Sequence, residues 1–135
     1  MSDMTSHPVG PALLFAPAHR PELPAKAFDR ADTVIIDLED GAGTGDRAIM
    51  YDNIRGTGLD LDRTILRTTG PGAEGFAGDV ALARELGIST VMVPKLREQV
   101  PDGLSGLRII AMIETPQALV NIGEIVNHEA VTGLF

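Results

Sequence analysis

The stretch that decides the fold is Val34–Gly41, which reads VIIDLEDG. Its apolar residues are mostly β-branched, and they run into carboxylates at Asp37, Glu39 and Asp40 before a glycine ends the segment. An apolar run of this length fits a strand buried on both faces, as in a parallel sheet. The acids then lie at the C-terminal end of the strand, where α/β folds bind ligands. The alternative is that they cap the next helix or are solvated in its loop.

Short strands and helices are expected to alternate along the whole chain. Strands are predicted at Ala12–Ala16, Thr33–Leu38, Thr64–Arg67, Thr90–Val93, Arg108–Ile113 and Val131–Phe135. Helices are predicted at about Pro21–Arg30, from about Asp46, from Phe76 to a C-terminal cap at Gly87, and after Thr115–Pro116. Successive strands begin roughly 20–30 residues apart, which is typical of βα units in a parallel sheet.

Apolar spacing predicts the buried faces of two of these helices. In the helix that follows Asp46, the expected buried residues are Ile49, Met50 and Ile54. In the helix that follows Pro116, they are Leu119, Ile122, Ile125 and Val126.

Two α/β architectures fit this alternation: a complete doubly wound sheet, or about five and a half units of an eight-unit (β/α)₈ barrel. Such a barrel typically needs about 250 residues, so this chain of 135 residues would hold only part of one. We expect residues 1–11 to form an N-terminal arm and residues 12–135 to form a single domain.

Composition excludes several classes of function. The net charge of −8, from 11 basic and 19 acidic residues, argues against non-specific nucleic-acid binding and against an anionic membrane surface. The chain has no cysteine, which excludes disulfides, cysteine-bound zinc and a cysteine nucleophile. No apolar run reaches the roughly 18 residues of a membrane span, and the opening MSDMTSHPVGP has no signal-peptide pattern. The expected location is the cytoplasm.

Charged residues recur at the C-terminal ends of four predicted strands. The acids of VIIDLEDG are followed by Arg67, Lys95 and Glu114 after the next three strands. These ends converge on one face in either architecture. Carboxylates suit Mg²⁺, and an arginine beside them can bind a carboxylate or carbonyl oxygen with two hydrogen bonds. The set therefore indicates a site for an oxyanion held on a metal, as in enolate chemistry.

Each member of this set also has a purely structural interpretation. Arg67 could form an ion pair with Asp37 or Glu39, and Lys95 could be solvated. Glu114 directly precedes a predicted helix and could act only on the helix dipole.

Six segments of the chain can be compared with known families: LLFAPAHRPE, AKAF, VIIDLEDG, the LR of Leu66–Arg67, VMVPK and MIETPQALVNIGEI. Together they resemble the HpcH/HpaI aldolase and citrate lyase β-subunit family. Their order and spacing agree with the family from about Leu13 to Phe135. The resemblance is closest to stand-alone citrate-lyase-β-like proteins of the citramalyl-CoA or malyl-CoA lyase type.

The resemblance implies an oligomeric TIM barrel that cleaves or forms carbon–carbon bonds next to a thioester or keto acid with Mg²⁺. It implies that Glu114 is a metal ligand that also contacts substrate, and that Arg67 binds substrate oxygens and stabilises an enolate. Glu39 and Asp40 would hold metal-bound waters or orient Arg67. Lys95 would line the substrate pocket.

The chain departs from the family pattern at several places. Thr69 stands where the family usually has asparagine, and Arg47 and Tyr51 stand where lysine and arginine are usual. The family's second metal-binding acid would lie just past Phe135. These departures lead to the prediction that the chain is the N-terminal half of a lyase-like barrel, with little activity by itself.

Four functional hypotheses follow. The first is Mg²⁺-dependent retro-aldol or retro-Claisen cleavage of a hydroxyacyl-CoA or citryl-type thioester, carried on CoA or an acyl-carrier protein. The second is a malyl-CoA-type thioesterase on the same site. The third is a receiver-like doubly wound signalling domain, with Asp37 as phosphoacceptor and Lys95 as its charge partner. The fourth is a non-catalytic half-barrel that partners another chain.

Overall fold

All strands of the described chain belong to one parallel sheet. The computed structural model describes residues 10–39 and 45–135. The strands are β1 (Leu13–Pro17), β2 (Thr33–Asp37), β3 (Thr64–Arg67), β4 (Thr90–Val93), β5 (Arg108–Ala111) and β6 (Val131–Leu134). They pair in the order β1-β2-β3-β4-β5-β6, each parallel to the next.

This sequential order decides between the two predicted architectures. A receiver-like doubly wound sheet has strand order 2-1-3-4-5, so its first strand lies inside the sheet. Here β1 is at one edge and every strand lies beside its predecessor, as in a (β/α)₈ barrel. The fold is therefore α/β and consistent with part of a TIM barrel.

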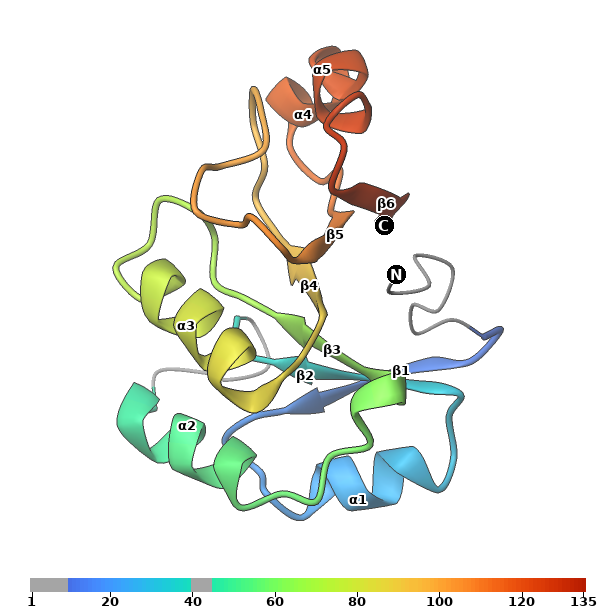
Figure 1. Ribbon diagram of the computed structural model, residues 1–135, viewed down its shortest axis with the longest axis vertical. Helices are drawn as coiled ribbons and strands as arrows, with labels where there is room; N and C mark the ends of the chain where they lie inside the picture. The colour runs from blue at the N-terminus through green and yellow to red at the C-terminus, as the bar shows by residue number, and fades with distance from the viewer. Residues whose placement is uncertain (1–9, 40–44) are drawn as a thin grey trace.

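Along the chain, the helices occur in the segments that connect one strand to the next, as the sequence predicts (Figure 1). They are α1 (Leu23–Phe28), α2 (Arg47–Arg55), α3 (Phe76–Leu86), α4 (Pro116–Val120) and α5 (Ile122–Val126), with a short 3₁₀-helix, η2 (Leu61–Arg63). Asp46 caps α2 by accepting a hydrogen bond from the Ala48 N–H. Gly87 ends α3 in the left-handed region, with φ of 76°. Both helix boundaries confirm the prediction.

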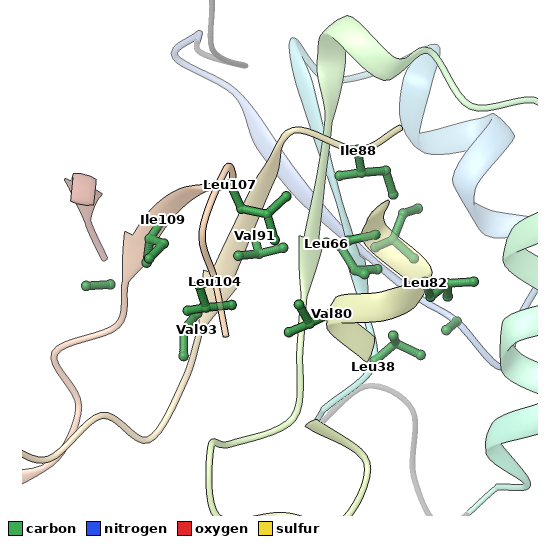
Figure 2. Close-up of a cluster of buried hydrophobic side chains, with 14 of the residues drawn as sticks. Leu38, Leu66, Val80, Leu82, Ile88, Val91, Val93, Leu104, Leu107 and Ile109 are labelled. Atoms are coloured by element: carbon green, nitrogen blue, oxygen red, sulfur yellow. The ribbon is translucent and has the colours of Figure 1, made fainter. Parts of the chain in front are cut away.

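The main hydrophobic core lies between the sheet and α1, α2 and α3. Alternate strand residues point into it, because side chains along a strand alternate between the two faces of a sheet. Figure 2 shows Leu66, Val91, Val93 and Ile109 from the strands packed with residues of and near α3, and with Leu104 and Leu107 from the connection before β5. This packing holds the ends of β3, β4 and β5 in fixed positions.

The opposite face of the sheet carries a second, smaller core. Ile35, Ile65, Met92 and Met112 form it, and Phe15 and Ile110 pack against them. Phe15 of β1 also meets Phe135, next to β6, edge to face with ring centroids 5.9 Å apart. Since β1 and β6 are opposite edges of the sheet, this contact shows that the sheet curls toward closure.

The structure corrects the predicted helix faces. Ile49 is 60 % exposed, and only Met50 and Ile54 of α2 reach the core. The single helix predicted after Pro116 is two short helices, and Leu119 in the first and Val126 in the second are 65 % and 42 % exposed. The helix breaks at Asn121, whose side-chain amide donates to the Gln117 carbonyl and competes with the helical hydrogen bonds.

Two predictions fall wholly or partly on residues that are not described. Asp40 lies outside the described residues, and so does most of the predicted arm, residues 1–9. Four strands differ slightly from their predicted bounds: β1 is shifted by one residue, to Leu13–Pro17, and β2, β5 and β6 end earlier, at Asp37, Ala111 and Leu134. Among the residues with described positions, no helix has the length and apolar character to cross a bilayer.

Candidate active site

An ion pair between Asp37 and Arg67 lies at the C-terminal ends of β2 and β3. The two residues are register partners on adjacent parallel strands, so their side chains project from the same face. Arg67 donates from Nε to Asp37 Oδ1 at 2.8 Å and from Nη2 to Oδ2 at 2.7 Å. Asp37 is 2 % exposed and Arg67 is 8 % exposed. The guanidinium also lies 4.6 Å from the centroid of the Phe15 ring. Arg67 is therefore held by its partner and by an aromatic platform.

Glu39 lies beside this pair. One of its carboxylate oxygens, Oε1, is 3.6 Å from Arg67 Nη1, and its backbone N–H donates to Asp37 Oδ1 at 2.9 Å. The structure thus brings together Asp37, Glu39 and Arg67, as the strand-end pattern predicts. It pairs Arg67 most closely with Asp37 and places Glu39 on the Nη1 side of the guanidinium.

Glu114 and Lys95 form a second pair, at the ends of β5 and β4. Glu114 Oε1 accepts a hydrogen bond from the Lys95 backbone N–H at 2.8 Å and lies 3.7 Å from Lys95 Nζ. Lys95 has a positive φ of 54°, which is uncommon for a residue other than glycine. Thr115, next to Glu114, caps α4 by accepting from the Ala118 N–H. Glu114 therefore stabilises the turn that follows β4.

A groove connects the neighbourhoods of the two pairs. It has a volume of about 530 Å³. The residues lining this strand-end groove are Glu39, Thr69, Gly70, Pro71, Gly72, Ala73, Lys95 and Arg97. Each of the predicted site residues that are described therefore lines the groove or contacts a residue that does.

A buried carboxylate at Asp79, in α3, was missed by the sequence analysis. It is fully buried and accepts at Oδ1 from Arg47 Nη2 and from the Tyr51 hydroxyl, the latter at 2.6 Å. At Oδ2 it accepts from the backbone N–H and the hydroxyl of Thr69, at 2.8 and 2.9 Å. Asp79 thus links α2 and α3 to the start of the loop that lines the groove. Its partners are the three residues at which the sequence departs from the family pattern.

The Asp79 cluster changes the acidity of its neighbours. Burial lowers the pKa of Arg47, but the hydrogen bonds to Asp79 and Tyr51 outweigh burial, so the net shift is upward. For Tyr51, burial and the hydrogen bond to Asp79 both raise the pKa. The cluster is therefore expected to hold Arg47 charged and Tyr51 neutral.

Tyr51 gives a direct test of this cluster, because the chain has one tyrosine and no tryptophan. In a spectrophotometric titration of the folded protein, we expect the phenolate absorbance to appear with a midpoint above the ordinary tyrosine pKa of about 10. The stability that Tyr51 contributes is present below that value and is lost as pH rises through the higher folded-state pKa. Asp79→Asn should move the midpoint back toward the ordinary value. A midpoint at the ordinary value in the folded wild type would contradict the described contacts.

The described carboxylates suit a magnesium ion only in part. Oxygen ligands fit Mg²⁺, which often binds through one or two carboxylates and keeps several waters. Glu114 is partly exposed next to the groove and can offer such an oxygen. Within residues 10–39 and 45–135, no three histidines, cysteines, aspartates or glutamates cluster closely enough to hold a metal. Water, substrate oxygens or other carboxylates would have to complete the coordination.

Comparison with known proteins agrees with this architecture. No protein-family model matches the chain. A citrate lyase subunit beta-like protein of Mycobacterium tuberculosis is 36 % identical over 133 residues, which cover 97 % of this chain and 48 % of the relative. The structure of CitE from the same organism with magnesium and acetoacetate aligns with a TM-score of 0.87 and 34 % identity, over 97 % of this chain and 55 % of that chain.

Two further structures extend the comparison. The M. tuberculosis citrate lyase beta subunit with oxaloacetate and magnesium aligns with a TM-score of 0.81 and 33 % identity, over 93 % of this chain and 56 % of that chain. RipC from Yersinia pestis has a TM-score of 0.61 at 20 % identity, over 90 % of this chain and 55 % of that chain, and shows a shared fold only. The resemblance inferred from the sequence is therefore confirmed: the chain is related to the citrate lyase β-subunit-like proteins and spans about half the length of the curated relatives it matches.

Proposed function

We propose that the chain forms part of the active site of a Mg²⁺-dependent carbon–carbon lyase acting on a hydroxyacyl-CoA or citryl-type thioester. The observation that carries this proposal is the placement of Glu39, Arg67, Lys95 and Glu114. They lie at or just past the C-terminal ends of four consecutive parallel strands, on or next to one groove. In barrels of this kind the active site lies at that end of the strands.

The ligands of the related structures support the same chemistry. CitE structures from M. tuberculosis contain magnesium with acetoacetate and coenzyme A, and magnesium with pyruvate. A further one contains oxaloacetate and magnesium. Acetoacetate, pyruvate and oxaloacetate are keto acids of the size that cleavage of a hydroxyacyl thioester releases.

We assign Arg67 the role of stabilising the negative charge that develops on a substrate oxygen during cleavage. Lyase cleavage transfers the hydroxyl proton of the substrate to a base and breaks the adjacent carbon–carbon bond, whose electron pair becomes an enolate of the thioester. Protonation of the enolate carbon then gives the acyl-CoA. Asp37 holds the Arg67 guanidinium through Nε and Nη2, and we assign the substrate oxygen to this guanidinium. A guanidinium fixed in advance stabilises such a charge without reorganising during the reaction. Glu39 helps to orient it.

Glu114 is assigned as the metal ligand and Lys95 as a group that lines the pocket and contacts substrate. Mg²⁺, when bound, supplies Lewis-acid polarisation of a substrate oxygen. We keep Asp40 in its predicted role beside Glu39.

We also propose that residues 1–135 alone have little lyase activity, because a single described acid is assigned to the metal. The proposal includes a cytoplasmic location and a homo-oligomeric longer protein.

Glu114→Gln tests the metal assignment in the 135-residue chain itself. We expect the variant to bind Mg²⁺ at least about tenfold more weakly in a calorimetric titration, since even residues outside the metal's own coordination shell often contribute that much. Glu98→Gln is the matched control, because Glu98 lies in an adjoining hollow that also includes Lys95. Equal Mg²⁺ affinities for wild type and Glu114→Gln would remove Glu114 from the proposed site.

A further inference from the structure

The carboxylate assigned to the metal already has a cation beside it. Glu114 Oε1 lies 3.7 Å from Lys95 Nζ and accepts the Lys95 backbone N–H at 2.8 Å. Both contacts involve the same oxygen atom. A divalent cation that binds this carboxylate brings a second positive charge close to the ammonium group, and like charges repel.

The position of Lys95 is strongly constrained, although its ammonium group is not buried. The Lys95 backbone is in the left-handed region, with φ of 54°. A residue with a Cβ adopts this conformation only at a cost in free energy. The loop after β3 also lies close against it, because a Cβ added at Gly70 would be 3.2 Å from Lys95 Cβ. The side chain of Lys95 is nevertheless 54 % exposed. Its backbone is therefore held in place, while its ammonium group can move.

We propose that Lys95 is an exchangeable counter-ion of Glu114. Without metal, its ammonium neutralises the carboxylate. When a divalent cation binds Glu114, the ammonium leaves it and turns into the strand-end groove. This inference rests on the proposed function, because it takes Glu114 as the metal ligand.

Electrostatics gives the exchange a direction and a consequence. Two cations compete for one carboxylate, so the lysine weakens metal binding and the metal displaces the lysine. The displaced ammonium stays in the groove with Arg97, which also lines it. In a chain with a net charge of −8, these two groups make a local site for an anionic part of a ligand. Metal binding thereby prepares the groove for an anionic substrate, and the two ligands should bind cooperatively.

The chain allows a clean test because it has two lysines, Lys26 and Lys95. Lys26 is exposed on α1 and serves as the matched control. We expect Lys95→Met to bind Mg²⁺ about two- to fivefold more tightly than wild type, the range that a partly exposed ion pair supports. Lys26→Met should leave the affinity unchanged. Lys95→Asn, which tolerates the left-handed backbone, should behave like Lys95→Met.

A spectroscopic measurement on the wild type follows the exchange without any substitution. With lysine labelled at Cε, the carbon NMR spectrum contains two lysine signals. Addition of MgCl₂ at constant ionic strength should shift the Lys95 signal with the same midpoint as calorimetry and leave the Lys26 signal in place. An unshifted Lys95 signal at Mg²⁺ saturation, or unchanged affinity in both Lys95 variants, overturns the exchange.

The outcomes separate this inference from the proposed function. If Glu114→Gln weakens Mg²⁺ binding but the Lys95 variants do not change it, the exchange is wrong and the metal assignment stands. If wild type and every variant fail to bind Mg²⁺, both are wrong. Tighter binding by Lys95→Met and Lys95→Asn together with a Mg²⁺-dependent shift of the Lys95 signal supports the exchange.

Discussion

Asp37→Ala is expected to lower the free energy of unfolding by about 3–5 kcal/mol, because it leaves the charge of Arg67 buried without its main partner. Asp37 is 2 % exposed, and it binds the guanidinium through both oxygens at 2.8 and 2.7 Å. Glu39 Oε1, at 3.6 Å from Nη1, is too distant to replace both of these hydrogen bonds. Urea denaturation followed by circular dichroism measures the loss.

The control for this prediction is an ion pair of the same type on the surface. Arg55 and Glu85 also form a two-point pair, but their side chains are 42 % and 52 % exposed. Glu85→Ala should therefore leave the unfolding midpoint close to that of the wild type. If Asp37→Ala shifted the unfolding midpoint as little as Glu85→Ala, the buried Asp37–Arg67 pair would not contribute to stability as proposed.

The Asp37–Arg67 pair shows that the structural and functional interpretations of a charged residue are compatible. The sequence left open whether Arg67 pairs with an acid or meets a substrate. The structure pairs it with Asp37, and this pairing is also what would hold the guanidinium ready for a substrate oxygen. Fixing a charged group before the reaction is a general means of lowering a barrier.

The strands were well predicted because their signal is local. Thr64–Arg67 and Thr90–Val93 have the predicted bounds, since short β-branched runs between turn residues identify buried parallel strands. Caps such as Asp46 and Gly87 are equally local. Helix faces were harder, because the direction in which Ile49 points depends on how α2 rests on the sheet. The order of the strands could not be chosen from alternation alone.

The Asp79 cluster could not be predicted, because its contacts join residues that are far apart in the sequence. Its hydrogen bonds join α3 to Thr69, ten residues earlier, and to Arg47 and Tyr51, 32 and 28 residues earlier. No spacing rule links such distant positions. Asp79 also lies in a helix, and from the sequence alone an acidic residue in a helix is expected to face solvent. A signal was present, because the three residues that depart from the family pattern turn out to share this one partner.

Arg67→Ala is expected to have the largest effect on activity, about 10²- to 10³-fold on turnover, which is the usual cost of losing one donor to a developing oxyanion. The experiment uses a chimera in which this chain replaces the matching part of the M. tuberculosis citrate lyase subunit beta-like protein, which it covers over 48 % of its length. Circular dichroism and thermal melting establish that wild-type and variant chimeras are folded. Arg67→Lys, which keeps the charge but cannot form the two-point contact with Asp37, should recover part of the rate.

The matched control is an arginine at the opposite end of the sheet. Arg108 begins β5 and donates to the Ser89 hydroxyl, just before β4, so both lie at the opposite ends of these strands from Lys95 and Glu114. Residues at the N-terminal ends of barrel strands generally serve stability and not catalysis. Arg108→Ala should therefore leave the turnover of the folded chimera within about twofold of wild type.

The most direct test of the proposed function is the rate at which the folded chimera releases a keto acid and an acyl-CoA from a hydroxyacyl-CoA, measured with and without Mg²⁺. Release of free CoA instead would indicate the thioesterase alternative. The lyase proposal predicts Mg²⁺-dependent release of both lyase products, lost with Arg67→Ala and retained with Arg108→Ala. A folded chimera that cleaves the substrate equally well with alanine at position 67 would contradict it.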